Sequence, residues 1–233
     1  MPGIKSSDIE YGANGERGSG YLARPDDGDA HGAPHPGVIV IQEWWGLDAH
    51  IRDVADRFAR EGFVALAPDL YHGKTASEPD EARKLAMNLN RERAAADLAG
   101  AVRYLLDLPN VAPKKAGCIG FCMGGSMTLM LAAANANIAA GAPFYAGFMP
   151  PPGELAKIEA ELFCAFGADD AGIPIEKVRE FESTLRSHGK NAVVKVYEGA
   201  PHSFFNDTKP SYRPAAAADA WEHALSLFRR VLQ

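Results

Sequence analysis

Cysteine is scarce in this sequence, which has only three in 233 residues, at positions 118, 122 and 164. A small, odd number of cysteines cannot build a disulfide framework and suits a reducing compartment. Long apolar runs are also lacking: no stretch reaches the ~18 apolar residues of a membrane-spanning helix, and residues 1–5 begin no signal-peptide-like run. We therefore expect a cytoplasmic protein with no membrane partner.

The sequence also lacks a basic block. Lysine and arginine number 24 against 30 aspartates and glutamates, which gives a net charge of −6. Nucleic-acid binding usually requires a basic surface, so this balance argues against a nucleic-acid partner. We expect a small-molecule substrate and a monomeric protein.

Metal-ligand spacing is another feature that the sequence lacks. His31 and His35 lie in a stretch rich in Pro, Gly and Asp at 25–37, with no acidic or cysteine partner at ligand spacing. A solvated loop is the simpler interpretation. Cys118 and Cys164 fall within predicted strands, where a core position is expected. Nothing in the sequence requires a metal or an organic cofactor.

The chain does contain strands that alternate with helices. The run of β-branched residues at 38–41 is typical of a parallel strand buried on both faces. Residues 8–12 and 20–24 predict an antiparallel hairpin with its turn at 12–18. Further strands are predicted at 63–67, 116–119, 138–145, 162–166 and 192–197, and helices at 48–61, within 80–108 as two segments, after residue 122, at 174–188 and at the C-terminal end. We predict a single α/β domain over residues 1–233, with a mostly parallel central sheet and helices on both faces.

One stretch of the chain has the pattern of a catalytic turn. Residues 120–124 read G-F-C-M-G and stand between a predicted strand and a run of small and aliphatic residues at 127–134. This resembles the nucleophile elbow of α/β-hydrolases, with Cys122 in place of serine. Its glycines relieve a strained turn, and the following helix N-terminus would favour a thiolate and an oxyanion. A glycine-rich turn with a buried cysteine explains the motif alone about equally well.

The order of residues later in the chain favours catalysis. A thiol nucleophile needs a base to take its proton and a third group to orient that base. His202 follows the predicted strand at 192–197, and either Asp169 or Asp170 follows the strand before it. One of these aspartates could instead cap the next helix. We favour Asp170 as the partner of His202, with Cys122 as nucleophile.

Acidic and aromatic residues follow the strand at 38–41. Glu43, Trp44 and Trp45 stand where open α/β sheets bind ligands, at the carboxyl ends of the strands. A solvated glutamate beside core tryptophans is the alternative. The oxyanion hole would be formed by the backbone N–H groups of Met123 and Trp44.

With these motifs the sequence resembles the dienelactone hydrolases, or carboxymethylenebutenolidases. The similar segments extend over nearly the whole chain in the order of that family. They are residues 42–46 (Q-E-W-W-G), 68–71 (P-D-L-Y), 120–125 (G-F-C-M-G-G), 144–145 (F-Y), 167–174 (G-A-D-D-A-G-I-P) and 199–204 (G-A-P-H-S-F).

The resemblance implies a hydrolase of lactone or ester bonds that acts through a thioester intermediate. It implies Cys122 as nucleophile, His202 as base and Asp170 as the residue that orients the base. It also implies that Glu43 contacts the thiol and keeps the resting cysteine neutral, which would protect it from oxidation.

Substrate contacts are less completely matched. We expect Tyr145, Trp45 and Arg83 to contact substrate, although a solvated surface arginine explains Arg83 equally well. The family carries an arginine four residues after the histidine, which binds the substrate carboxylate, and this sequence has Asn206 there. This departure leaves two alternatives open beside a dienelactone hydrolase: a carboxylesterase for neutral esters, or a non-catalytic scaffold that binds small molecules.

Overall fold

The computed structural model describes residues 3–26 and 34–233. The chain divides into two compact units between Gly117 and Cys118. His31 and most of the predicted loop at 25–37 lie outside the described residues.

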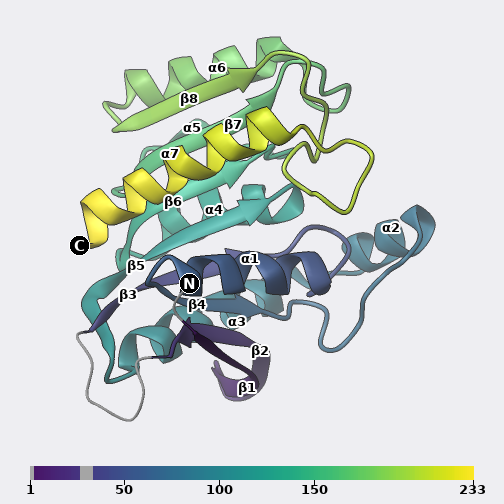
Figure 1. The fold of residues 1–233 in the computed structure, drawn as a ribbon. Helices are drawn as coiled ribbons and strands as arrows, with labels where there is room; N and C mark the ends of the chain where they lie inside the picture. Colours follow the sequence, from purple (N-terminus) through teal and green to yellow (C-terminus); the bar gives the residue numbers. More distant parts are fainter. Residues whose placement is uncertain (1–2, 27–33) are drawn as a thin grey trace. The chain divides into compact units, whose positions relative to one another are not determined.

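The strands of the first unit begin with the predicted hairpin. Strands β1 (Ile4–Ala13) and β2 (Glu16–Pro25) pair antiparallel along their whole length. The turn between them is shorter than predicted, because Asn14 and Gly15 both adopt positive φ, at 49° and 85°, and close a two-residue turn. β2 pairs antiparallel with β4 (Val64–Pro68), and β4 pairs parallel with β3 (His35–Ile41), as Figure 1 shows.

Three helices complete the first unit. Helix α1 (Ala49–Arg60) begins where the Asp48 side chain accepts a hydrogen bond from the Ile51 N–H, and its buried face packs on β4. Helix α2 (Pro79–Met87) is largely exposed. Helix α3 (Arg91–Asp107) starts at Asn90, which caps the Arg93 N–H, and it packs on β1 and β4. α1 and α3 thus cover opposite faces of these strands (Figure 1).

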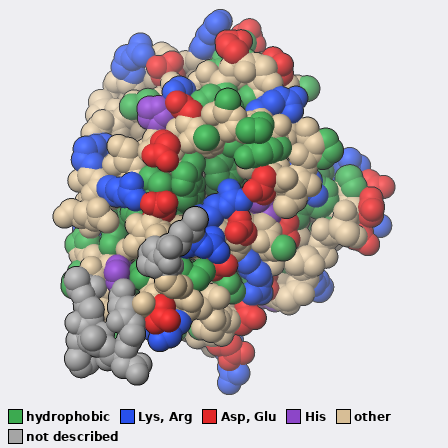
Figure 2. Space-filling model, in the orientation of Figure 1, with side chains coloured by type: hydrophobic (Ala, Val, Ile, Leu, Met, Phe, Trp, Pro, Cys, Tyr) green, Lys and Arg blue, Asp and Glu red, His purple; other side chains and the backbone are tan. Residues whose placement is uncertain are grey.

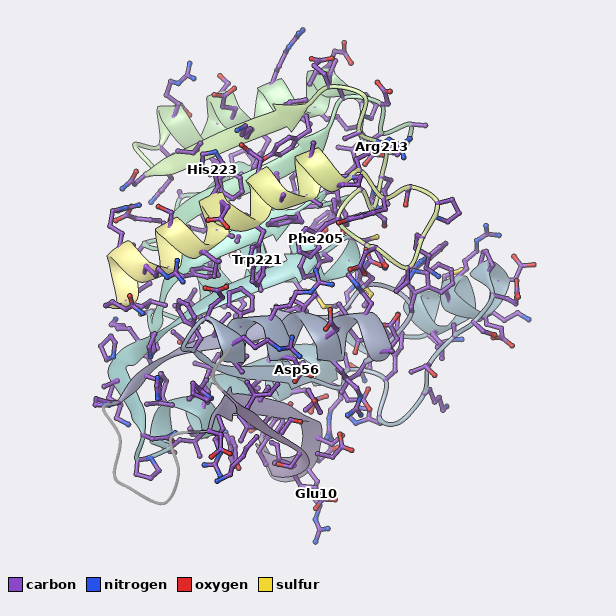
Figure 3. The ribbon with its side chains drawn as sticks, in the orientation of Figure 1. Glu10, Asp56, Phe205, Arg213, Trp221 and His223 are labelled. Carbon is purple, nitrogen blue, oxygen red and sulfur yellow. The ribbon has the colours of Figure 1, made fainter. Side chains whose placement is uncertain are left out.

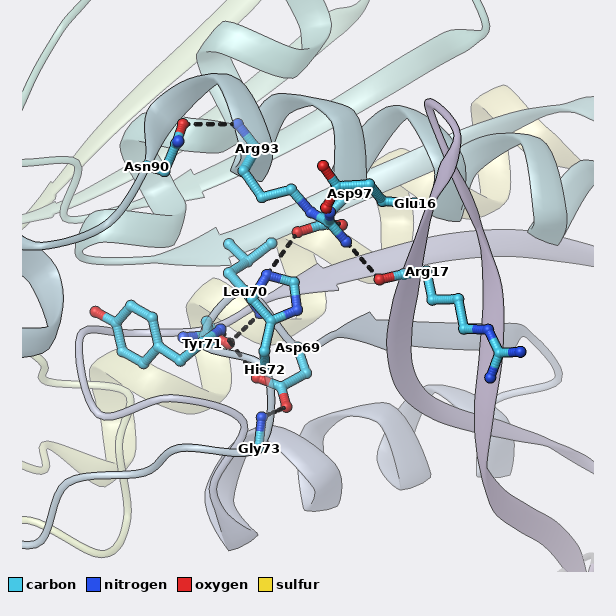
Figure 4. Close-up of polar contacts among 11 residues, drawn as sticks. Glu16, Arg17, Asp69, Leu70, Tyr71, His72, Gly73, Asn90, Arg93 and Asp97 are labelled. Atoms are coloured by element: carbon cyan, nitrogen blue, oxygen red, sulfur yellow. Dashed lines mark hydrogen bonds and ion pairs between the residues drawn. The ribbon is translucent and has the colours of Figure 1, made fainter.

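A buried polar network holds the loop after β4 against α3 (Figure 4). The Asp97 side chain is completely buried on α3, with Arg93 Nε 3.0 Å from Oδ1 and His72 Nε2 3.2 Å from Oδ2. In the same loop, Asp69 accepts a hydrogen bond from the Gly73 N–H at 2.5 Å. Burial raises the pKa of Asp97, and the charges of His72 and Arg93 oppose this shift.

The second unit continues the alternation of strands and helices. Strand β5 (Val111–Phe121) crosses the boundary between the units and leads into α4 (Met123–Ala134). Strands β6 (Ile138–Phe144), β7 (Glu161–Gly167) and β8 (Ala192–Tyr197) pair parallel in that order. The remaining helices are α5 (Pro152–Leu155), α6 (Ile175–Ser187) and α7 (Pro214–Leu232). In Figure 1, α7 lies in front of these strands and α4 behind them. The predicted α/β class with mostly parallel pairing and an N-terminal hairpin is confirmed.

Aromatic side chains form the core of the second unit near the carboxyl ends of its strands. Phe121 stacks on Phe205 with ring centroids 5.0 Å apart, and Phe144 meets Phe205 edge to face at 5.3 Å. Phe205 also lies 6.0 Å from the half-buried Trp221 of α7, so helix and loop share one aromatic cluster (Figure 3). Such packing anchors the loops that follow β5, β6 and β8.

Charges of both signs are interspersed over the face shown in Figure 2, where no single basic stripe is visible. Among residues 3–26 and 34–233, no helix has the length and apolar character needed to cross a membrane.

Candidate active site

The turn between β5 and α4 has the geometry of a nucleophile elbow. Cys122 adopts φ 55° and ψ −113°, a conformation that a residue with a side chain seldom occupies. A Cβ on Gly120 would lie 2.1 Å from the Gly124 carbonyl oxygen, and one on Gly125 would lie 2.5 Å from that of Phe144. Only glycine fits at these two positions; Gly120 is the first glycine of the predicted motif, and Gly125 lies one residue beyond its last. The Cys122 N–H is bonded to the Phe144 oxygen at 3.1 Å, which ties the elbow to β6.

The histidine and the acid after the later strands are in direct contact. His202 Nδ1 lies 2.6 Å from Asp170 Oδ2, and the Asp170 side chain is only 1% exposed. The other carboxylate oxygen, Oδ1, accepts hydrogen bonds from the N–H groups of Gly172 at 2.8 Å and Ile173 at 3.2 Å. Asp169, the alternative in the sequence, is exposed. The structure therefore pairs His202 with Asp170.

Cys122 is the third member of this group. Burial of His202 disfavours its charged form, but hydrogen bonds and charge interactions with Asp170 and Cys122 outweigh this and raise its pKa to about 10. Because Nδ1 is taken by Asp170, Nε2 is the nitrogen left for the Cys122 sulfur. At neutral pH this environment favours a protonated imidazole between two acidic partners.

Backbone hydrogen bonds hold the loops of Asp170 and His202 together. The Ala168 N–H donates to the Tyr197 oxygen at 2.9 Å, and the Asp169 N–H donates to the Ala200 oxygen at 3.0 Å. Gly167 allows this approach, since a Cβ there would lie 2.1 Å from the Ala200 oxygen. The separation of acid and base is thus determined by main-chain geometry.

Arg213, which belongs to none of the sequence motifs, holds the other side of the His202 loop. Arg213 lies on the segment leading into α7 (Figure 3). Its side-chain Nε donates a hydrogen bond to the Gly199 oxygen at 3.1 Å, and its backbone N–H donates one to the Phe204 oxygen at 2.9 Å. The Ser211 hydroxyl donates to the Ser203 oxygen at 3.2 Å, and Ser203 adopts a positive φ of 58°. Sequence analysis missed Arg213, because these acceptors are main-chain carbonyls that no motif identifies.

Tyr145 forms one wall beside the imidazole. Its ring is completely buried and lies 5.1 Å from the His202 ring, edge to face. The residue has a positive φ of 37°, and its N–H donates to the Ala165 oxygen at 2.7 Å. Tyr145 thus packs on the candidate base, and its role as a substrate contact stays a prediction.

Asn206, at the expected carboxylate-binding position, is turned into its own loop. The residue is fully buried, and its Oδ1 accepts hydrogen bonds from the Thr208 N–H at 3.1 Å and the Thr208 hydroxyl at 2.6 Å. Its side chain thus stabilises the loop and supplies no cation.

The other predicted residues lie in the first unit. Glu43, 1% exposed, follows β3 together with Trp44 and Trp45, whose rings meet edge to face at 5.3 Å. Arg83 is on the exposed helix α2, 3.5 Å from Asp80. Cys122, Asp170, His202 and Met123, the first residue of α4, belong to the second unit. The roles of the first-unit residues remain predictions.

No cluster of three or more His, Cys, Asp or Glu side chains suited to a metal ion occurs within the described part of the chain. His35, one of the two histidines considered for a metal, starts β3, and its Nδ1 lies 2.9 Å from the Gly62 oxygen.

A cysteine on a strained strand-to-helix turn, with an acid and a histidine after later parallel strands, defines an α/β-hydrolase. Comparison with known proteins identifies the family. The model of the dienelactone hydrolase family matches residues 19–232. "Protein usf" of Aquifex pyrophilus is 36% identical over 96% of this chain and 98% of its own, and "Putative carboxymethylenebutenolidase" of Synechocystis sp. is 37% identical over 92% of each.

A solved structure agrees with these relatives. The crystal structure of a "Putative Dienelactone Hydrolase" from Klebsiella pneumoniae is 28% identical, covers 98% of this chain and 99% of its own, and has a TM-score of 0.89. The chain belongs to the dienelactone hydrolase family and has the α/β-hydrolase fold. It is a hydrolase of ester or lactone bonds.

Proposed function

We propose that this hydrolase uses Cys122, His202 and Asp170 as a catalytic triad and passes through a thioester acyl-enzyme. The observation that carries the proposal is the environment of His202, whose Nδ1 lies 2.6 Å from Asp170 and whose pKa rises to about 10 through Asp170 and Cys122 despite burial. An imidazolium between a carboxylate and a sulfur is suited to pairing with a thiolate nucleophile.

In the acylation step, the Cys122 thiolate attacks the carbonyl carbon and a C–S bond forms. The N–H groups of Met123 and Trp44 would stabilise the oxyanion of the tetrahedral intermediate. The intermediate collapses as the ester C–O bond breaks, and the His202 imidazolium gives its proton to the leaving alkoxide. With a lactone, the new hydroxyl group stays attached to the acyl chain.

Deacylation follows from the changed charge on sulfur. A thioester sulfur is neutral, so one of the interactions that raise the pKa of His202 is lost. The neutral imidazole then takes a proton from water, and the resulting hydroxide attacks the thioester. The products are the carboxylic acid and the Cys122 thiolate, with the proton back on His202. Asp170 holds the imidazole in the required tautomer throughout.

Glu43 would act on the resting thiol. A carboxylate beside sulfur disfavours the thiolate and would limit its oxidation before substrate binds. This role opposes the effect of His202, so the two residues would set the thiolate fraction together. If Glu43 has this role, Glu43→Gln alkylates faster with iodoacetamide than the wild type at neutral pH; an unchanged rate would exclude it.

A carboxylesterase that prefers neutral esters is the second candidate function. Its support is the buried Asn206, whose side chain is bonded to Thr208 where the resemblance calls for a carboxylate-binding arginine. We further propose a cytoplasmic location, which the free thiols of Cys118, Cys122 and Cys164 support.

The test is turnover of a dienelactone and of a neutral aryl acetate, measured in parallel. Cys122→Ala should abolish turnover of both and remain folded, whereas the control Cys164→Ala, which removes a thiol buried in β7, should stay active. Substantial activity in Cys122→Ala would exclude the triad. Faster opening of the dienelactone would support recognition of its carboxylate, and cleavage of the acetate alone would favour the neutral esterase. Turnover of neither, with a Cys122 no more reactive than a free thiol, would favour the non-catalytic scaffold.

A further inference from the structure

A half-open groove of about 330 Å³ lies in the second unit, between the segment after β6 and helices α5 and α6. Its apolar lining comes from three successive prolines at 150–152 and the side chains of Phe148, Met149, Leu155, Ile173 and Phe181, and its polar lining includes the side chains of Lys177, Glu180 and Thr184. Small-molecule sites have volumes of about 300–1,000 Å³ and predominantly apolar walls, so this groove has the size for a chain or ring.

Hydrogen bonds connect the walls of the groove to residues of the candidate triad. On one wall, the Phe148 N–H donates to the Ser126 hydroxyl at 2.9 Å, and the Ser126 N–H donates to the Cys122 oxygen at 3.2 Å. On the other wall, the Ile173 N–H donates to Asp170 Oδ1 at 3.2 Å. Each wall is therefore one or two hydrogen bonds from a reacting or orienting residue.

The charges and the exposure at the groove indicate what would fill it. Phe148 is 54% exposed, which leaves a large apolar surface in water at the mouth of a cavity. Lys177 and Glu180 are three residues apart on α6 and carry opposite charges, so the groove has no net charge from this helix. A neutral apolar group is favoured over an anion.

We propose that this groove binds the neutral apolar chain or ring of the ester substrate while its carbonyl is at Cys122. The proposal rests on the proposed hydrolase function and adds the substrate class, which is esters with a long alkyl or an aryl substituent. The substituent could belong to the acid or to the alcohol of the ester, and the two are distinguished below.

The kinetic test uses a substitution that fills the groove. Thr184 lines it from α6, and Thr184→Trp would occupy its volume; the neighbouring Ser183, which does not line it, provides the matched control Ser183→Trp. We expect Thr184→Trp to lower the ratio of kcat/KM for a long-chain ester to kcat/KM for the acetate by at least tenfold, about the effect of losing contact with two methylene groups. Ser183→Trp should leave the ratio unchanged.

Two substrate series assign the group that is bound. One lengthens the acyl chain of p-nitrophenyl esters, and the other lengthens the alcohol of alkyl acetates. A loss confined to one series identifies that side of the ester as the occupant. Equal ratios for wild type and Thr184→Trp in both series would overturn the proposal while leaving the hydrolase function intact.

A binding measurement does not depend on turnover. With ¹³C-methyl methionine labelling, the Met149 signal, assigned through Met149→Leu, should shift with saturating octan-1-ol, and Thr184→Trp should abolish the shift. The wild type and Ser183→Trp should behave alike. Absence of a saturable shift in the wild type would refute the site even if no ester is hydrolysed.

Discussion

The buried carboxylate of Asp170 allows a specific test of how His202 is oriented. Its Oδ1 receives two backbone N–H groups, from Gly172 and Ile173, and its Oδ2 faces His202 Nδ1. In Asp170→Asn, the amide oxygen can replace only one of these acceptors. If it faces the two N–H groups, the amide NH₂ meets Nδ1 and forces the imidazole proton onto Nε2. That tautomer can take a proton from neither thiol nor water.

The magnitude follows from the cost of the opposite orientation. Turning the amide oxygen toward His202 would leave the N–H groups of Gly172 and Ile173 without their acceptor. A buried unsatisfied donor costs about 1–3 kcal/mol, so the inactive tautomer is favoured by about 2–6 kcal/mol. At 1.36 kcal/mol per tenfold, kcat should fall by about 30- to 25,000-fold.

The assay combines kinetics with a tautomer readout. Hydrolysis of an aryl acetate by Asp170→Asn would be measured over pH, with ¹⁵N-histidine spectra reporting which ring nitrogen carries the proton. The exposed neighbour provides the control Asp169→Asn, which should keep wild-type kcat. A folded Asp170→Asn with kcat within tenfold of the wild type, or with its proton still on Nδ1 of His202, would refute the reasoning.

Three other perturbations have defined outcomes. Asp97→Ala should lower the free energy of unfolding by about 3 kcal/mol in urea titrations, because it removes the buried carboxylate between Arg93 and His72 and leaves Arg93 only the exposed Glu16 as a carboxylate partner; an unchanged midpoint would contradict this. Arg213→Ala should lower kcat about tenfold and shift the pH profile with little change in KM, and Arg213→Lys should recover part of the loss if the contact to the Gly199 oxygen positions the loop; equal effects on kcat and KM would speak against it. The pKa of His202 in the folded protein is raised from its ordinary value of about 6.5 to about 10. The stabilisation from its charge is therefore complete below about pH 6.5 and is lost as the pH rises toward about 10. The stability difference between wild type and His202→Gln should narrow over that range of pH, and a constant difference would be inconsistent with the raised pKa.

The arrangement of the candidate site could be predicted where side-chain type and local pattern coincide. The elbow was identified because Gly120 and Cys122 stand between a strand and a helix, and both have the expected geometry. His202 and Asp170 were selected by their positions after successive strands, since parallel strands present their carboxyl ends at one edge. Contact between these two side chains follows from that order.

The sequence does not reveal features that depend on hydrogen bonds to main-chain groups or on which partner a long side chain contacts. Strand β5 begins at Val111, before the predicted start at residue 116, and its first part was missed because the side chains at 113–115 are exposed and give no apolar signal. Asp97 occupies a helix position that suggests a solvated face, yet Arg93 and His72 allow its burial. Asn206 matched a position of substrate recognition, and only its hydrogen bonds to its own loop reveal a structural role.

The close approach of Gly167 to the Ala200 carbonyl has a consequence for how this enzyme can diversify. Acid and base are joined through peptide groups, which every sequence retains, so mutation of surrounding side chains leaves their separation intact. The segment at 146–151 and the exposed positions of α6 are thus separable from the reaction chemistry. Randomising them in a mutant library should yield new substrate preferences at a high frequency of active clones, whereas any side chain at position 167 should remove activity from the whole population.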